Sequence, residues 1–281
     1  IAENISDVYI VDYMNLFSRI GTDNVFDIRY WQIGQAPLGK KALVPLGREY
    51  GKFFRALNGK TKKCLVLDCD NTLWGGVVGE DLLGGINLNS SYPGSSYRSF
   101  QEEVLNLHDR GVILTLCSKN NEEDVLEVLR NHDLMLINEN HLSTWQINWD
   151  DKVTNIKRIA EDLNIGLDSL VFIDDSEFEC NLVRKELPEV EVIQFSKEAY
   201  KMKSVLSECG FFDSLTYSSE DRKKNKLYQS EVKRNKIYKA AGNIEDYLEK
   251  LRIVIDIQTP HKSEIPRLSQ LIQKTNQFNL T

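Results

Sequence analysis

Short apolar runs that each end in a carboxylate or a hydroxyl constrain the fold of this chain more than any other feature. The runs are residues 64–67, 112–117 and 170–173, and they are followed by Asp68, Ser118 and Asp174. Continuously apolar runs of this length are typical of parallel strands that are buried on both faces. Because helical patterns separate them, we expect a doubly wound α/β sheet, with these polar residues at its carboxyl edge, where such sheets bind ligands.

The first run leads into two carboxylates, Asp68 and Asp70, which Thr72 and a glycine-rich turn follow. Side chains alternate across a strand, so both carboxylates are expected on one face at the strand's carboxyl end. Two carboxylates this close stay ionised together only if a cation or strong donors lie between them. The pair therefore predicts a metal site in which one carboxylate attacks and the other moves a proton. The alternative is an acidic strand end without chemistry, which the polar residues downstream disfavour.

Further polar residues follow the pair in a set order along the chain. After Ser118 comes Lys152, which opens a stretch with apolar residues at helical spacing, and the third run ends in Asp174 and Asp175. The pattern predicts strands and helices alternating over residues 61–208. The expected elements are 64–68, 96–110, 112–117, 121–131, 152–163, 169–174, 177–187, 190–194 and 197–207.

Composition excludes several classes of function. Of the 281 residues, 41% are hydrophobic and 27% charged, which is ordinary for a globular protein. The net charge of −7 argues against nucleic acid as the main partner. No apolar run approaches the ~20 residues of a membrane span, so no membrane partner is expected. Five cysteines without a framework spacing indicate reduced thiols and a cytoplasmic location, and the scattered histidines do not predict a histidine-based metal site.

The motif order DxDxT, Ser, Lys, DD resembles the haloacid dehalogenase (HAD) superfamily of phosphotransferases. The strings at 67–81 (LDCDNTLWGGVVGED), 118–120 (SKN) and 172–175 (FIDD) resemble its FkbH-like branch, which is capless and classed as subfamily IIIC. The close resemblance covers about residues 60–205. It implies an α/β HAD-like Rossmannoid sheet, capless, with flanking partial domains.

The resemblance also suggests how the chain is divided. Residues 61–210 would form the HAD-like (FkbH) phosphatase domain, and 211–250 a helical linker. Residues 1–60, with a strand-like run at 8–13 and a helical stretch at 44–57, resemble the tail of an SGNH-like segment that lacks its nucleophile motif. Residues 251–281 begin with an alternating, strand-like run at 251–257 and resemble the start of a truncated GNAT-like acyltransferase domain.

Roles for the main site residues are implied by the resemblance. Asp68 would be the nucleophile that forms an aspartyl-phosphate, and Asp70 the general acid and base. Mg²⁺ would be held by Asp68, by Asp70 through its backbone carbonyl, and by Asp174 or Asp175. Of this last pair, Asp174 is expected as the direct ligand and Asp175 behind it. Two further residues would act on the phosphoryl group: Ser118 would donate a hydrogen bond to it, and Lys152 would offset its charge.

Several further residues are weaker candidates for the site. Thr72 is a candidate for substrate binding, with a loop-fixing hydroxyl as the alternative. Asn120 is another, with a helix cap as the alternative. Glu179 is expected either to hold Lys152 or the metal's waters, or to be a surface residue. Trp74 and the glycines after it are expected to shape a flap.

The predicted activity is that of a Mg²⁺-dependent phosphatase acting through an aspartyl-phosphate. The resemblance implies more: transfer of a glyceryl group from 1,3-bisphosphoglycerate to an acyl carrier protein. The expected partners are thus a phosphorylated small molecule or acyl phosphate, with an acyl carrier protein as a further candidate. Cys69 is a candidate acyl acceptor, but strand alternation turns it away from the two aspartates and favours a packing residue. The non-enzymatic alternative is a phosphorylatable switch, whose acidic pair would stand on the first strand rather than on the third run.

Overall fold

A computed structural model describes residues 8–195, 198–215 and 221–239, together with the isolated residues 259, 261, 262, 265 and 268. The chain divides into two compact units, residues 1–235 and 236–281, and the sheet lies in the first. None of the helices in the described part of the chain is long and apolar enough to cross a membrane.

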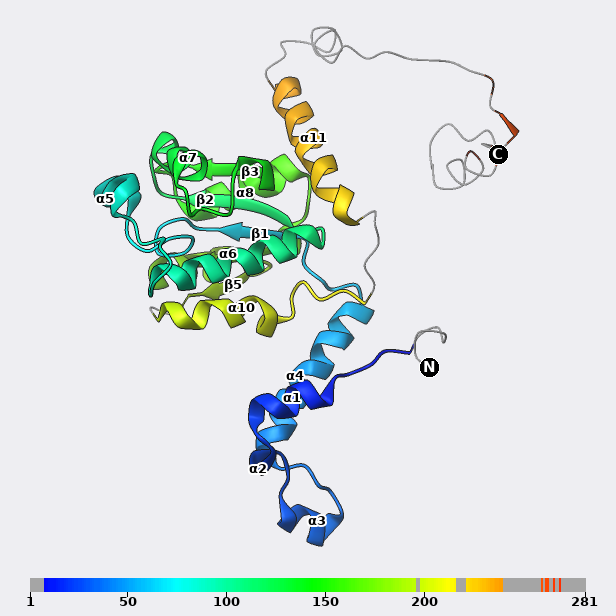
Figure 1. Cartoon of the computed structure of the whole chain (residues 1–281). Coiled ribbons are helices and arrows are strands. Elements are labelled where there is room, and N and C mark those ends of the chain that lie inside the picture. Colours follow the sequence, from blue (N-terminus) through cyan, green and yellow to red (C-terminus); the bar gives the residue numbers. More distant parts are fainter. Residues whose placement is uncertain are drawn as a thin grey trace. The chain divides into compact units, whose positions relative to one another are not determined.

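A five-stranded parallel sheet forms the centre of the first unit (Figure 1). Its strands are β1 Cys64–Leu67, β2 Ile113–Ser118, β3 Leu142–Ile147, β4 Leu170–Asp174 and β5 Glu191–Gln194. They lie in the order β3-β2-β1-β4-β5, so the chain winds outward from β1 in one direction and then in the other. The carboxyl ends of β2, β1 and β4 therefore meet where the winding direction reverses, which is where such sheets bind ligands. The predicted doubly wound α/β sheet is confirmed.

Helices flank the sheet and close two apolar clusters over it. They are α5 Val78–Gly85, α6 Gly94–Asp109, α7 Glu122–Asn131, α8 Lys152–Leu163, α9 Glu177–Glu186, α10 Met202–Cys209 and α11 Asp221–Lys239. Side chains of α6, α7 and α10 share one cluster with Leu65 and Leu67 of β1. Side chains of α8, α9 and α11 share the other with Cys64 and Val66. Because β1 alternates between the two clusters, it is buried on both faces, as its apolar run predicts.

Helix α8 shows how local sequence fixes a site residue. Asp151 caps the helix by accepting a hydrogen bond from the Thr154 backbone N–H, and Asn164 ends it in the left-handed conformation. Ile156 and Leu163 lie on the face that packs against the sheet. The cap and the apolar face together place Lys152 in the first helical turn, at the carboxyl edge of the strands.

Two elements differ from the sequence prediction inside the sheet domain. Strand β3 occupies a stretch where one helix and a loop were expected before Lys152. It pairs only with β2, so it is an edge strand, and its mixed sequence LSTWQI lacks the apolar continuity of the central strands. Helix α5 lies within the expected flap. No domain-sized insertion is found among the described residues between β1 and β3, in agreement with a capless site.

The first 60 residues were partly mispredicted. Residues 8–12 form no strand, because Asp12 caps helix α1, Tyr13–Ile20, which starts within the expected strand. Helices α2 Thr22–Val25, α3 Ile28–Gly34 and α4 Lys40–Leu57 follow, and α4 contains the helix predicted at 44–57. The helix predicted at 197–207 is found as a short 3-10 turn, η4 Ala199–Lys201, and α10. The strand predicted at 251–257 lies outside the described residues.

Replacing Ile156 by alanine is expected to lower the free energy of unfolding by about 2–5 kcal/mol, because the side chain is fully buried between α8 and the sheet. Urea denaturation measures this. Lys157→Ala, on the exposed side of the same helix, is the matched control and should change stability by less than about 0.5 kcal/mol. Equal effects of the two substitutions would contradict the packing described for α8.

Candidate active site

Three strands deliver polar side chains to one buried place at the carboxyl edge of the sheet. Asp68 directly follows β1, Ser118 is the last residue of β2, and Asp174 is the last residue of β4. Their exposed fractions are 5%, 1% and 0%. The parallel register of β1 with both neighbours accounts for this convergence, since it aligns the carboxyl ends of the three strands.

Lys152 lies between two of these carboxylates. Its Nζ is 2.7 Å from Asp68 Oδ1 and also donates a hydrogen bond to Asp174 Oδ2. Burial opposes the charged ammonium, but the Asp68 and Asp174 carboxylates outweigh burial and raise the pKa of Lys152. Lys152 is therefore a charged, buried ammonium between two carboxylates.

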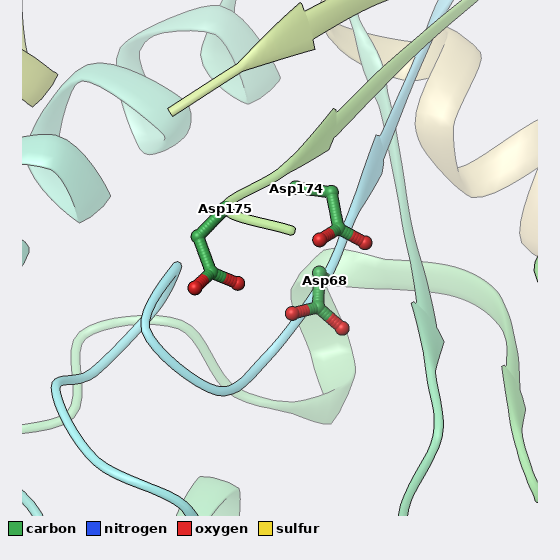
Figure 2. Close-up of side chains that lie close together, drawn as sticks. All are labelled: Asp68, Asp174 and Asp175. Atoms are coloured by element: carbon green, nitrogen blue, oxygen red, sulfur yellow. The ribbon is translucent and has the colours of Figure 1, made fainter. Parts of the chain in front are cut away.

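Asp68, Asp174 and Asp175 form a cluster suited to a divalent cation. One carboxylate oxygen from each lies within 4.8 Å of the others, and Figure 2 shows the three side chains close together. Burial, followed by the charge of Asp68, raises the pKa values of both Asp174 and Asp175. Three carboxylates beside one ammonium leave negative charge in excess, and an all-oxygen donor set is the one that Mg²⁺ prefers. These residues thus fit the expected metal.

Asp70 lies in a different environment from Asp68. Its Oδ1 accepts hydrogen bonds from Trp74 Nε1 at 2.9 Å and from the Val78 backbone N–H at 3.0 Å. Its Oδ2 accepts one from Asn120 Nδ2 at 2.9 Å. Burial raises the pKa of Asp70 by more than the hydrogen bonds from these donors lower it. A partly buried carboxylate with a raised pKa and no ion pair in the described structure is suited to carrying a proton.

The remaining predicted residues also converge here. Ser118 Oγ donates to Asp68 Oδ1 at 2.9 Å, and Asn120 Nδ2 lies 3.2 Å from Ser118 Oγ. Asn120 is not the helix cap, because Asn121 stands at the N-cap of α7. The Thr72 hydroxyl is buried and has no hydrogen-bond partner within the described structure. A loop-fixing bond from the Thr72 hydroxyl is therefore not found among the described residues.

The sequence matches the model of the NLI interacting factor-like phosphatase family over residues 63–222, which is more than half of the chain. The chain belongs to this family. It is therefore a phosphatase of the HAD superfamily, as the motif order predicts. No curated protein matches the sequence.

Solved structures similar to this phosphatase include the N-terminal part of the protein BF1531 from Bacteroides fragilis, which contains a phosphatase domain and was crystallised with Mg. The two are 34% identical with a TM-score of 0.69, and the match covers 72% of this chain and 54% of that one. This phosphatase thus spans about half the length of that relative. The HAD family enzyme bt-2542 from Bacteroides thetaiotaomicron is 14% identical with a TM-score of 0.34. That match covers 48% of this chain and 95% of the enzyme.

Cys69, between the two aspartates, is fully buried in the apolar cluster that α6 and α7 share with β1. Burial, followed by the charge of Asp68, raises the pKa of the Cys69 thiol well above its usual range. A buried, protonated thiol is a poor nucleophile. The structure thus favours the packing residue over the acyl acceptor.

Sequence reasoning missed one ion pair at the rim of the site. Lys119 Nζ lies 2.6 Å from Glu179 Oε1, and Glu179 is 8% exposed. One role expected for Glu179 was to hold Lys152, whose carboxylate partners are instead Asp68 and Asp174. The alternative of a surface residue is also wrong, because Glu179 is buried. Lys119 lies just beyond the end of β2, where strand alternation no longer fixes the direction of a side chain, so the sequence pattern carries no signal for this pair.

Replacing Lys152 by methionine is expected to lower the free energy of unfolding by about 3–5 kcal/mol in EDTA, because it leaves two buried carboxylates without their cation. Addition of Mg²⁺ should recover part of the loss. Urea denaturation of wild type and variant, with and without Mg²⁺, measures both effects. The control Lys119→Met breaks a more exposed pair and should cost less; a loss below about 1 kcal/mol in Lys152→Met would contradict the role given to the buried ammonium.

Proposed function

We propose that this phosphatase transfers the phosphoryl group of its substrate first to Asp68 and then to water, with Mg²⁺ as its cofactor. The observation that carries the proposal is the buried cluster in which Lys152 contacts Asp68 and Asp174, with Asp175 beside them. The Bacteroides fragilis relative, crystallised with Mg, supports the choice of metal. Asp68, Asp174 and Asp175 would hold Mg²⁺, with the Asp70 backbone carbonyl as a further ligand. A bound Mg²⁺ would reduce the repulsion between the carboxylate and the phosphate.

The first half of the reaction forms an aspartyl-phosphate. An Asp68 carboxylate oxygen attacks phosphorus, the bond from phosphorus to the leaving oxygen breaks, and that oxygen takes a proton from Asp70. Lys152 and Ser118 bind the equatorial oxygens, where negative charge is spread in the transition state. The buried Thr72 hydroxyl is available as a further donor.

The second half returns the enzyme to its starting state. Asp70 takes a proton from a water molecule, the water oxygen bonds to phosphorus, and the bond between Asp68 and phosphorus breaks. Inorganic phosphate leaves with the free Asp68 carboxylate restored. A phosphorylatable switch would need a slow second half, which a proton acceptor beside the phosphoryl group disfavours.

Asp68→Asn is expected to abolish phosphate release, because an amide does not attack phosphorus. The assay is release of phosphate from a panel of acyl, aryl and alkyl phosphates, with Mg²⁺ or with EDTA. The wild type should release phosphate only with Mg²⁺, and the variant about 10³-fold less or not at all. Asp133→Asn, an exposed aspartate after α7, is the control and should retain wild-type activity. Appreciable activity of Asp68→Asn with an intact fold would remove Asp68 from the nucleophile role.

Asp70→Asn is expected to accumulate phosphorylated enzyme when the substrate is an acyl phosphate. Such a substrate needs little help from an acid in the first half, whereas water needs a base in the second half. Intact-mass spectrometry after rapid mixing would detect the added phosphoryl group. An unchanged turnover rate together with no phosphorylated species would exclude Asp70 as the base.

The finer proposal concerns the acceptor and the domains. We propose residues 61–210 as the catalytic domain, with SGNH-like and GNAT-like segments on either side. We also propose transfer of a glyceryl group from 1,3-bisphosphoglycerate to an acyl carrier protein as a candidate activity of this FkbH-like site. A capless site is open enough for a carrier-bound group. Adding a carrier thiol to the acyl-phosphate reaction tests this: thioester formation would support transfer, and phosphate release without thioester would limit the activity to hydrolysis.

A further inference from the structure

The Asp70 carboxylate has an unusually complete set of neutral donors. Trp74 and Val78 both donate to Oδ1, and Asn120 donates to Oδ2. Trp74 is fully buried and Asn120 is 4% exposed, so neither donor is readily replaced by water. The three donors come from the residue's own loop, from the start of α5 and from the loop after β2, so three separate segments restrain the carboxyl group.

The two oxygens of Asp70 are not equivalent under these restraints. Each carboxylate oxygen can accept about two hydrogen bonds through its lone pairs. Oδ1 already accepts two, whereas Oδ2 accepts one. One lone-pair position is therefore left for a proton, and it lies on Oδ2.

The donor on Oδ2 also links Asp70 to the nucleophile. Asn120 Nδ2 lies 3.2 Å from Ser118 Oγ, and Ser118 Oγ donates to Asp68 Oδ1. The amide of Asn120 thus lies between the two carboxylates that must act in concert. Asn120 thus links Oδ2 of Asp70 to Asp68 through the Ser118 hydroxyl.

We propose that Trp74 and Asn120 are positioning residues that make Asp70 exchange its proton with the substrate through Oδ2 alone. The inference rests on the proposed function, in which Asp70 is the acid and base. In the first half-reaction the proton on Oδ2 moves to the leaving oxygen as its bond to phosphorus breaks and the Asp68–phosphorus bond forms. In the second half, Oδ2 receives a proton from water as the water oxygen replaces Asp68 on phosphorus. The hydrogen bond from Trp74 keeps Oδ1 from taking part in either proton transfer.

Trp74→Phe tests this proposal, because it keeps an aromatic ring and removes the N–H. The measurement is the single-turnover release of the leaving group from an alkyl phosphate and from an acyl phosphate. A correctly placed acid matters for the alkyl leaving group and little for the acyl one, so the rate should fall by about tenfold to a hundredfold with the first and by less than about threefold with the second. Trp145→Phe removes an indole hydrogen bond to Glu122 elsewhere in the domain and is the matched control, with both rates unchanged.

Asn120→Leu removes the other donor and should show the same dependence on the leaving group, which keeps the proposal testable if Trp74→Phe does not fold. In an Asp70→Asn background, Trp74→Phe should have no further selective effect, because its proposed action passes through Asp70. Equal losses on both substrates in the two variants, or a selective loss that persists in the Asp70→Asn background, would overturn the proposal. If the wild type released no leaving group, or if Asp68→Asn remained active, the proposed function itself would fail instead.

Discussion

The contact between the Lys152 ammonium and the Asp68 and Asp174 carboxylates is the interaction on which the rest of the site depends. Without a cation, these buried carboxylates would repel each other at the ends of adjacent strands, and one of them would take up a proton. The sheet order places β1 beside β4, which brings the two acids together. The cap and apolar face of α8 then bring Lys152 to them. The start of one helix thus supplies the cation that lies between the two buried carboxylates.

The same sheet edge gives two aspartates, only two residues apart, different environments. Asp68 faces the buried ammonium of Lys152. Asp70 faces only neutral donors, and burial raises its pKa. Acid and base roles commonly divide in this way between neighbouring carboxylates whose surroundings differ. In the proposed mechanism this difference suits the spacing of the motif, because both side chains would reach one phosphoryl group from different environments.

Much of this arrangement can be predicted from sequence, and the exceptions have physical reasons. Strands β1, β2 and β4 are buried on both faces and therefore carry a continuous apolar signal. Edge strand β3 does not, so it was missed. The Lys152–Asp68 contact follows from the motif order. The bond of Trp74 to Asp70 depends on how the flap folds back onto the strand end, and that of Asn120 depends on the loop after β2. The strand predicted at 8–13 is wrong because Asp12 acts as a helix cap, and an apolar pattern does not predict a capping role.

The residue that holds the phosphoryl group during turnover is the most direct test of the proposed nucleophile. Acid quenching of the phosphatase during reaction with an acyl phosphate and Mg²⁺, followed by borohydride reduction, would convert an aspartyl-phosphate into homoserine and record its position in the peptide map. We predict homoserine at position 68 when Mg²⁺ is present and none in EDTA. Homoserine at another position, or phosphate release without any reducible intermediate, would contradict the central claim that Asp68 is the nucleophile.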